Sequence, residues 1–204
     1  MMIQIQIWAD FECPYCYFQT IVLEKLQARY REKLEIVWRA FELASVEDKT
    51  LPSKSYIENL EIAKSEPIVV QENLELLTPK FLTHTWLAQE SVCFANSQGL
   101  SLKLARALFD AFFLHGRDIS DETIVMKIAS QSGLDSKLLS QAIDNGELTK
   151  QVIADEQEFK AFGFQGVPAM WIGEKNFSPK SFTPATGYKT IEELLSLLPI
   201  SKHD

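Results

Sequence analysis

The order of strand and helix patterns predicts an α/β fold interrupted by a large, purely helical insertion. A β-α-β pattern fills the start of the chain, only helical patterns follow up to about residue 145, and an α-β-β-α pattern closes it. We therefore expect a discontinuous α/β domain, residues 1–45 and 146–204, and an inserted helical domain, residues 46–145. An insertion explains this order more simply than two tandem domains would.

The N-terminal pattern predicts two parallel strands joined by a helix. Ile3–Trp8 alternates apolar and polar residues with period two, which predicts a strand. Apolar residues at helical spacing predict a helix from Pro14 to about Tyr30, and Leu34–Leu43 is rich in β-formers and reads as a second strand. Strands connected by a helix of this length form a parallel βαβ unit.

The middle of the chain carries helical signals and no strand signals. Ser101, Ser120 or Asp121, and Asp135 stand where helices begin, and Gly99, Gly116, Gly133 and Gly146 follow positions where helices end. The expected helices are Tyr56–Ala63, His84–Gln98, the run beginning at Ser101 and ending before Gly116, the run from residue 120 or 121 to Gly133, and a short one from Asp135 to Asn145.

Strand signals return near the C-terminus. We expect a helix over Leu148–Phe162, a strand over Pro168–Ile172, a turn at Gly173–Asn176, a short extended piece, and a last helix over Thr190–Leu198.

Composition excludes several classes of function. The chain has 204 residues, 46% apolar and 24% charged, as in an ordinary globular protein. Its net charge of -8 argues against nucleic acid or an anionic membrane as a partner. The sequence has no apolar run of membrane-spanning length and no secretory leader pattern, so we expect a cytoplasmic protein. A stable structural disulfide is not expected there, so paired cysteines favour catalysis or redox sensing.

Two of the three cysteines, Cys13 and Cys16, stand at the predicted turn from strand to helix. This C-x-x-C arrangement is typical of thioredoxin-like redox proteins. The first helical turn favours a thiolate at Cys13, and the spacing puts Cys16 on the same helix face, where it can resolve a mixed disulfide. Asp10 and Glu12 would oppose the thiolate if they pointed at the sulfur, and the sequence does not fix their orientation.

A zinc site is the main structural alternative for this pair. Zinc needs four ligands, and none of the remaining candidates lies at zinc-finger spacing: His84, Cys93, His115 and His203. We therefore expect no metal. Cys93 lies in an apolar helical run and is expected in the core, with a regulatory thiol as the minority alternative. Tyr15, between the cysteines, is expected near the surface, where it can contact substrate.

Several stretches together resemble the DsbA-like thioredoxin-fold oxidoreductases, and within them the FrnE-like branch with its long helical insertion. They are Trp8–Cys16, Trp38–Leu43, Ala107–Ser120 and Gly166–Pro168, in the family's order along nearly the whole chain. The resemblance implies a disulfide oxidoreductase with Cys13, Cys16 and Pro168 at its active site. It also implies a cis Val167–Pro168 bond beside Cys13, with Pro14, Tyr15, Val167 and Pro168 contacting substrate.

Two departures from the branch concern redox direction and local shape. The pair between the cysteines is Pro14-Tyr15, where the branch usually has Pro-Trp, and this pair tunes the redox potential. Residues Asn176–Gly187 replace a shorter Gly-Ala-rich turn, so we expect a different shape before the last helix.

Three functions remain open, led by thiol–disulfide exchange on protein or small-molecule disulfides. The second is a glutathione-dependent isomerase or transferase, since the fold family includes kappa-class glutathione transferases and 2-hydroxychromene-2-carboxylate isomerases. Those enzymes typically carry serine at the nucleophile position, so Cys13 with Cys16 favours dithiol exchange. The third is a non-catalytic binding or chaperone module. We expect no bound cofactor, and glutathione as a candidate co-substrate.

Overall fold

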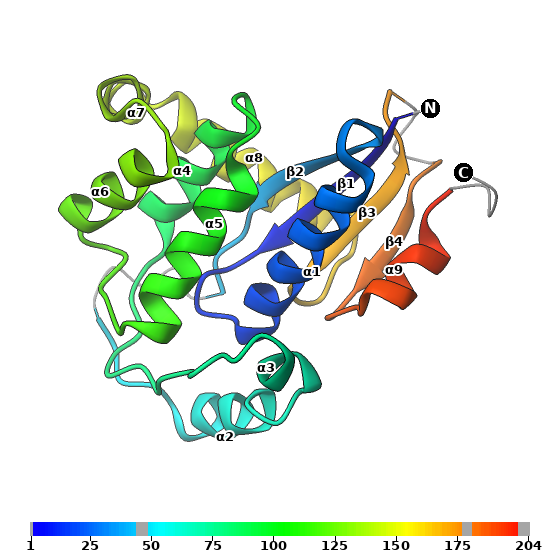
Figure 1. Cartoon of the computed structure of the whole chain (residues 1–204). Coiled ribbons are helices and arrows are strands. Elements are labelled where there is room, and N and C mark those ends of the chain that lie inside the picture. The colour runs from blue at the N-terminus through cyan, green and yellow to red at the C-terminus, as the bar shows by residue number, and fades with distance from the viewer. Residues whose placement is uncertain (1, 44–48, 177–180, 200–204) are drawn as a thin grey trace.

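The computed structural model describes residues 2–43, 49–176 and 181–199, which form one mixed sheet surrounded by helices (Figure 1). The strand order is β2-β1-β3-β4. β1 pairs in parallel with β2, whereas β3 runs antiparallel to both β1 and β4. The strands are β1 (Ile3–Ala9), β2 (Leu34–Ala40), β3 (Ala169–Glu174) and β4 (Thr183–Thr186).

Some helices adjoin the strands in sequence, and the others lie in the insertion. Those next to the sheet in sequence are α1 (Pro14–Tyr30), the 3-10 turn η1 (Arg31–Lys33), α8 (Glu147–Ala161) and α9 (Ile191–Leu197). The others are α2 (Lys54–Ala63), α3 (Pro67–Gln71), α4 (Trp86–Asn96), α5 (Ser101–Phe109), the π-helix η2 (Asp110–Leu114), α6 (Glu122–Ser132) and α7 (Ser136–Asp144). The predicted α/β fold with a helical insertion is confirmed.

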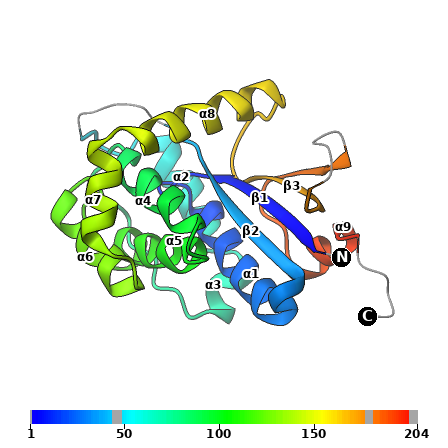
Figure 2. The ribbon, with the colours of Figure 1, turned by 90° about the horizontal axis from the view of Figure 1, so that it is seen from above.

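Side-chain alternation along β1 decides which helices cover which face of the sheet. Ile3, Ile5 and Ile7 point into the main core, which they share with α1. Trp8 points to the other face, into a smaller cluster with Phe159 of α8. Its indole N–H donates to the Asp155 carbonyl oxygen at 2.9 Å. Figure 2 shows α8 and α1 on opposite sides of the sheet.

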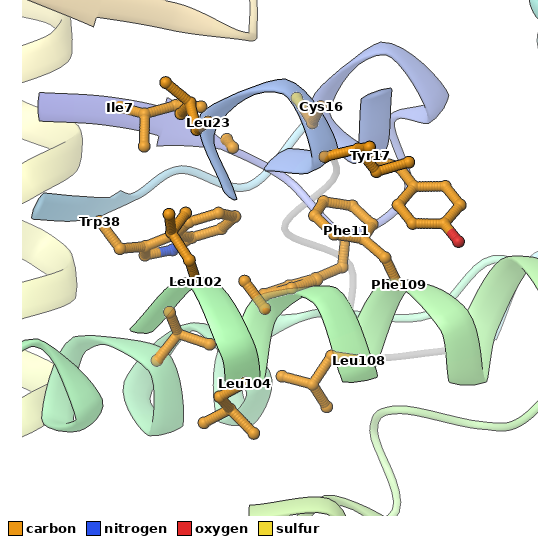
Figure 3. Packing of buried hydrophobic residues seen from close by; sticks show 14 of the residues in the cluster. Ile7, Phe11, Cys16, Tyr17, Leu23, Trp38, Leu102, Leu104, Leu108 and Phe109 are labelled. Atoms are coloured by element: carbon orange, nitrogen blue, oxygen red, sulfur yellow. The ribbon is translucent and has the colours of Figure 1, made fainter. Parts of the chain in front are cut away.

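The insertion and the sheet share one hydrophobic core. Phe11 lies between Trp38 of β2, at 5.3 Å between ring centroids, and Phe109 of α5, at 4.8 Å (Figure 3). All three side chains are fully buried. The predicted domain boundary at residues 45–46 lies outside the described residues, and one hydrophobic cluster includes side chains from both parts.

The outer edge of β2 is closed by side chains from helices. The Asn96 amide at the end of α4 accepts from the Trp38 N–H and donates to the Trp38 carbonyl, both at 2.9 Å. Asp155 of α8 accepts the Ala40 N–H at 3.0 Å. These bonds satisfy backbone groups that an edge strand otherwise leaves to solvent.

Four sequence predictions within the insertion and β2 need correction. β2 ends at Ala40 rather than Leu43, because its partner β1 ends at Ala9. The fourth helix begins at Trp86 rather than His84. Ser101 is the first residue of α5 and not its cap. At Asp110 the same helix changes to π geometry, and the His115 N–H donates to the Asp110 carbonyl at 3.1 Å.

The stretch predicted to lack strands contains one isolated antiparallel bridge between Thr50 and Leu82. Asp121 and Asp135 cap α6 and α7 with their carboxylates, as expected, and Thr190 caps α9. Within the part of the chain that the structure describes, no helix combines the length and apolarity needed to cross a bilayer.

Candidate active site

Cys13 is the N-cap residue of α1, directly after the loop that follows β1. It has extended backbone angles, φ -94° and ψ 113°, and Pro14 occupies the first helical turn, where its missing N–H costs nothing. The Cys16 N–H donates to the Cys13 carbonyl at 3.1 Å. The first helical turn therefore holds the two cysteines together.

The two thiols are free and differ in exposure. Cys13 is 8% exposed, whereas Cys16 is completely buried. Burial, reinforced by Cys13 beside it, raises the pKa of the Cys16 thiol well above its usual value. Cys16 is therefore a neutral thiol at neutral pH, behind a Cys13 that keeps a small exposed fraction.

The Val167–Pro168 loop lies against Cys13, as the resemblance implies. The bond is cis, and the Cys13 Sγ atom lies 3.7 Å from the Val167 carbonyl oxygen. A surface depression of about 360 Å³ opens here, lined by Gly163, Phe164, Gln165, Gly166, Val167, Thr186 and Gly187. Glycine-rich walls leave the backbone accessible to a ligand.

The other predicted contact residues differ in how much surface they offer. Tyr15 is partly exposed, and its ring packs edge-to-face on Phe18 at 5.8 Å. Val167 is partly exposed, whereas Pro14 and Pro168 are buried. A substrate at Cys13 therefore meets Tyr15 and Val167 more readily than either proline.

Asp10 and Glu12 turn their carboxylates toward the insertion rather than toward the sulfurs. Both are buried, and with Glu42, just beyond β2, they meet the segment before α4. Glu12 Oε1 accepts the Thr83 N–H at 2.6 Å, and Glu42 Oε1 accepts the Thr85 N–H at 2.6 Å.

Asp10 is held by two donors. Its Oδ1 accepts from the Thr85 hydroxyl at 2.7 Å, and its Oδ2 accepts from the Leu43 N–H at the same distance. Burial, with the charge of Asp10, raises the pKa of Glu12 to about 8 and that of Glu42 to about 7. Burial raises the pKa of Asp10 as well.

Two further contacts tie the start of α1 to the insertion. The Tyr56 hydroxyl of α2 donates to the Glu12 carbonyl at 2.9 Å, and Figure 1 shows α2 and α3 beside this end of α1. The Tyr17 hydroxyl donates to Asp110, which also accepts from Arg106 at 2.9 Å. The insertion thus contacts both the residue that precedes Cys13 and the side chain of Tyr17 within α1.

Cys93 belongs to the core, as predicted. It is buried on α4, and its thiol lies 3.7 Å from Asp155 Oδ2 of α8. Burial and the Asp155 carboxylate raise the pKa of this thiol well above its usual value. No group of three or more potential metal-ligating side chains is placed to hold an ion within residues 2–43, 49–176 and 181–199, a range that excludes His203.

Sequence reasoning found the cysteines and the Val167–Pro168 loop but missed Glu42, Thr83 and Thr85. The sequence drew attention to Asp10 and Glu12 but did not predict which way their side chains point. The available signal was a polar Thr83-His84-Thr85 run directly before an apolar helix, which predicts a cap and says nothing about distant carboxylates.

Comparisons with known proteins agree with this geometry. A solved candidate protein disulfide isomerase from Nitrosomonas europaea superposes with a TM-score of 0.80, 18% identity, and coverage of 97% of this chain and 96% of that one. A 2-hydroxychromene-2-carboxylate isomerase superposes with a TM-score of 0.72, 18% identity, and coverage of 95% and 93%. At these identities the likeness shows a shared fold.

A relative from Bacillus subtilis, the uncharacterized protein YwbO, is 25% identical over 184 residues, which are 85% of this chain and 88% of that protein. The family model of the DSBA-like thioredoxin domain matches residues 4–196. This span includes both cysteines, the helical insertion and the Val167–Pro168 loop. The chain therefore belongs to the family of DSBA-like thioredoxin domains.

Proposed function

We propose that the protein is a thiol–disulfide oxidoreductase in which Cys13 is the nucleophile and Cys16 the resolving thiol. The observation that carries this proposal is the position of Cys13 at the helix cap, slightly exposed and beside the Val167 carbonyl, with a fully buried Cys16 one helical turn away. A substrate sulfur can reach Cys13, whereas Cys16 is shielded from everything except a disulfide formed on Cys13.

The proposed reaction proceeds in two exchanges. The Cys13 thiolate attacks one sulfur of a substrate disulfide, forms a mixed disulfide and expels the other substrate sulfur as a thiolate. Cys16 then loses its proton and attacks Cys13 Sγ, which closes the Cys13–Cys16 disulfide and releases the second substrate sulfur. A dithiol, or two molecules of glutathione, restores the two thiols. The reverse sequence transfers a disulfide to a reduced substrate.

The substrate is proposed to lie along the Val167 loop. An extended peptide beside Cys13 finds Val167, partly exposed, and the depression that begins at Gly163. Backbone pairing of this kind tolerates many sequences, which suits exchange on protein or glutathione disulfides. We propose the cytoplasm as the compartment, because three free thiols suit a reducing environment.

A glutathione-dependent isomerase remains the second candidate, because the chain shares its fold with a 2-hydroxychromene-2-carboxylate isomerase. The two candidates make opposite demands on Cys16. Dithiol exchange needs it, whereas addition of glutathione to a substrate double bond needs no second thiol.

Reduction of insulin, followed by turbidity with dithiothreitol and separately with glutathione as the reductant, tests the proposal. We expect the wild-type protein to accelerate precipitation of the insulin B chain and the Cys13→Ser variant to be inactive. A wild-type protein indistinguishable from buffer with both reductants would reject thiol–disulfide exchange on protein substrates.

A further inference from the structure

Thr85 joins two buried carboxyl groups with a single hydroxyl. Its Oγ lies 2.7 Å from Asp10 Oδ1 and 3.2 Å from Glu42 Oε1. All three residues are at least nine-tenths buried. Within the described residues, no lysine, arginine or histidine forms an ion pair with Asp10, Glu12 or Glu42.

This geometry limits how many of the two carboxyl groups, Asp10 and Glu42, can be ionised together. A threonine hydroxyl has one proton to donate, so it satisfies one of the two carboxylates that flank it. With the hydroxyl proton donated to Asp10, Glu42 Oε1 accepts the Thr85 N–H at 2.6 Å instead, and the two carboxyl oxygens face each other across one hydroxyl oxygen. The Asp10–Glu42 pair therefore retains one proton, because two buried carboxylates at this separation strongly disfavour joint ionisation.

The remaining titratable groups around this pair favour the same state. Glu12 and the two cysteine thiols lie on the loop and the start of α1, Tyr56 reaches in from α2, and Glu156 of α8 accepts the Glu42 N–H at 3.2 Å. All become negative when they ionise, so each makes a second negative charge on the pair less favourable.

Asp10 also supports the helix-cap residue that carries the first thiol. Its carbonyl accepts the Cys13 N–H at 3.2 Å. The Asp10 side chain is held by Thr85 from the insertion and by the Leu43 N–H beyond β2. A displacement of Asp10 is therefore transmitted to the backbone of Cys13.

We propose that Thr85 is a positioning residue for the dithiol, whose hydroxyl holds Asp10 in place while the Asp10–Glu42 pair retains one proton. This proposal rests on the proposed function and adds that the inserted helical region sets the closeness of the two cysteines. Loss of the proton at alkaline pH places two carboxylates around one hydroxyl, releases Asp10 and makes the Cys13–Cys16 disulfide less favourable.

The test is the equilibrium constant for oxidation of the Cys13–Cys16 pair in glutathione redox buffers, quantified by mass spectrometry after acid quenching. This constant depends on the effective concentration of one thiol near the other, so small displacements matter. We expect Thr85→Val to lower it about tenfold, a typical size for lost positioning, and Thr85→Ser, which keeps the hydroxyl, to stay within about twofold of wild type. Thermal unfolding monitors folding of each variant.

A second variant covers the case in which Thr85→Val does not fold. The Glu42→Gln side chain stays neutral at every pH. The ratio of the wild-type oxidation constant to that of Glu42→Gln should therefore fall as the pH rises through about 7, while the thiol titrations common to both proteins cancel. A Thr85→Val constant within twofold of wild type, or a flat ratio between about pH 6 and 9, overturns the proposal. Because the equilibrium requires no turnover, an inactive wild-type protein would reject the proposed function and leave this test intact.

Discussion

The Cys13 sulfur lies 3.7 Å from the Val167 carbonyl oxygen, although 154 residues separate the two along the chain. The contact joins the N-terminal helix of the fold to the loop that opens β3. It places a partly exposed residue, Val167, beside the more exposed of the two cysteines.

The two cysteines should give opposite single-mutant phenotypes. Cys13→Ser removes the nucleophile and should abolish insulin reduction. Cys16→Ser should leave a Cys13 that accumulates mixed disulfides, because no resolving thiol remains. Non-reducing electrophoresis and mass spectrometry measure the trapped adducts, and wild-type insulin turnover by Cys16→Ser would contradict the assigned roles.

Cys93→Ala provides the matched thiol control. The Cys93 thiol lies against Asp155 of α8, outside the Cys13–Cys16 motif, so insulin turnover should stay within about twofold of wild type. Loss of its hydrogen bond and packing should lower the free energy of unfolding by about 1 kcal/mol. A large fall in turnover without unfolding would give Cys93 a redox role.

Tyr15→Ala should impair binding of protein substrates more than chemistry. Its ring is partly exposed between the cysteines, so truncation removes apolar contact with a bound chain. We expect the KM for insulin to rise about fivefold, equivalent to about 1 kcal/mol, with kcat changed less. Tyr30→Ala, at the far end of the same helix, is the control and should leave KM unchanged.

Stability should fall as the pH rises from about 4.5 toward 8. The folded state raises the pKa of Glu12 to about 8 and that of Glu42 to about 7, so it binds protons that the unfolded chain has already released. The contribution of these two carboxyl groups to stability is complete below their pKa values in the unfolded chain. It is lost as the pH rises through their pKa values in the folded protein.

Urea unfolding at several pH values measures this loss, which should be on the order of several kcal/mol in total. Glu12→Gln stays neutral in both states and should flatten the dependence. Equal slopes for the variant and the wild type would mean that Glu12 is ionised in the folded protein at neutral pH.

Arg39→Met should destabilise the fold strongly. The Arg39 guanidinium lies 2.7 Å from Asp155 Oδ1, and the Asp155 side chain is fully buried, so removal of the cation leaves a buried carboxylate without its charge partner. We expect a loss of about 3–5 kcal/mol in urea unfolding. Lys54→Ala is the control, since its pair with Glu58 is exposed to solvent and should contribute less than about 0.5 kcal/mol.

The sequence was sufficient to predict the parts of the site that depend on local pattern. The Cys13–Cys16 pair could be placed because an alternating strand, a proline and a helical pattern meet there. The position of Val167–Pro168 beside Cys13 was implied by the resemblance to DsbA-like proteins, whereas the local pattern indicated only a glycine-rich loop that opens a strand. The cysteine pair is thus a short-range signal, and the proline loop needed knowledge of the family.

The contacts of Asp10, Glu42 and Thr85 could not be predicted in this way. Three separate segments meet there, and each residue on its own is compatible with a solvated loop. The π-helix at Asp110 was missed for a related reason, because its apolar residues continue the helical spacing while the backbone gains one residue in a turn. Long-range packing decides both features.

Closure of the sheet edges has a consequence for self-association. β4 is four residues long and contains Pro184, which cannot donate a ladder hydrogen bond, so it is a poor template for a further strand. At the opposite edge, Asn96 occupies both backbone groups of Trp38. Partial unfolding that detaches α4 would free an apolar strand edge while the rest of the sheet persists. Asn96 of α4 therefore protects this edge of β2 from pairing with a strand of another molecule.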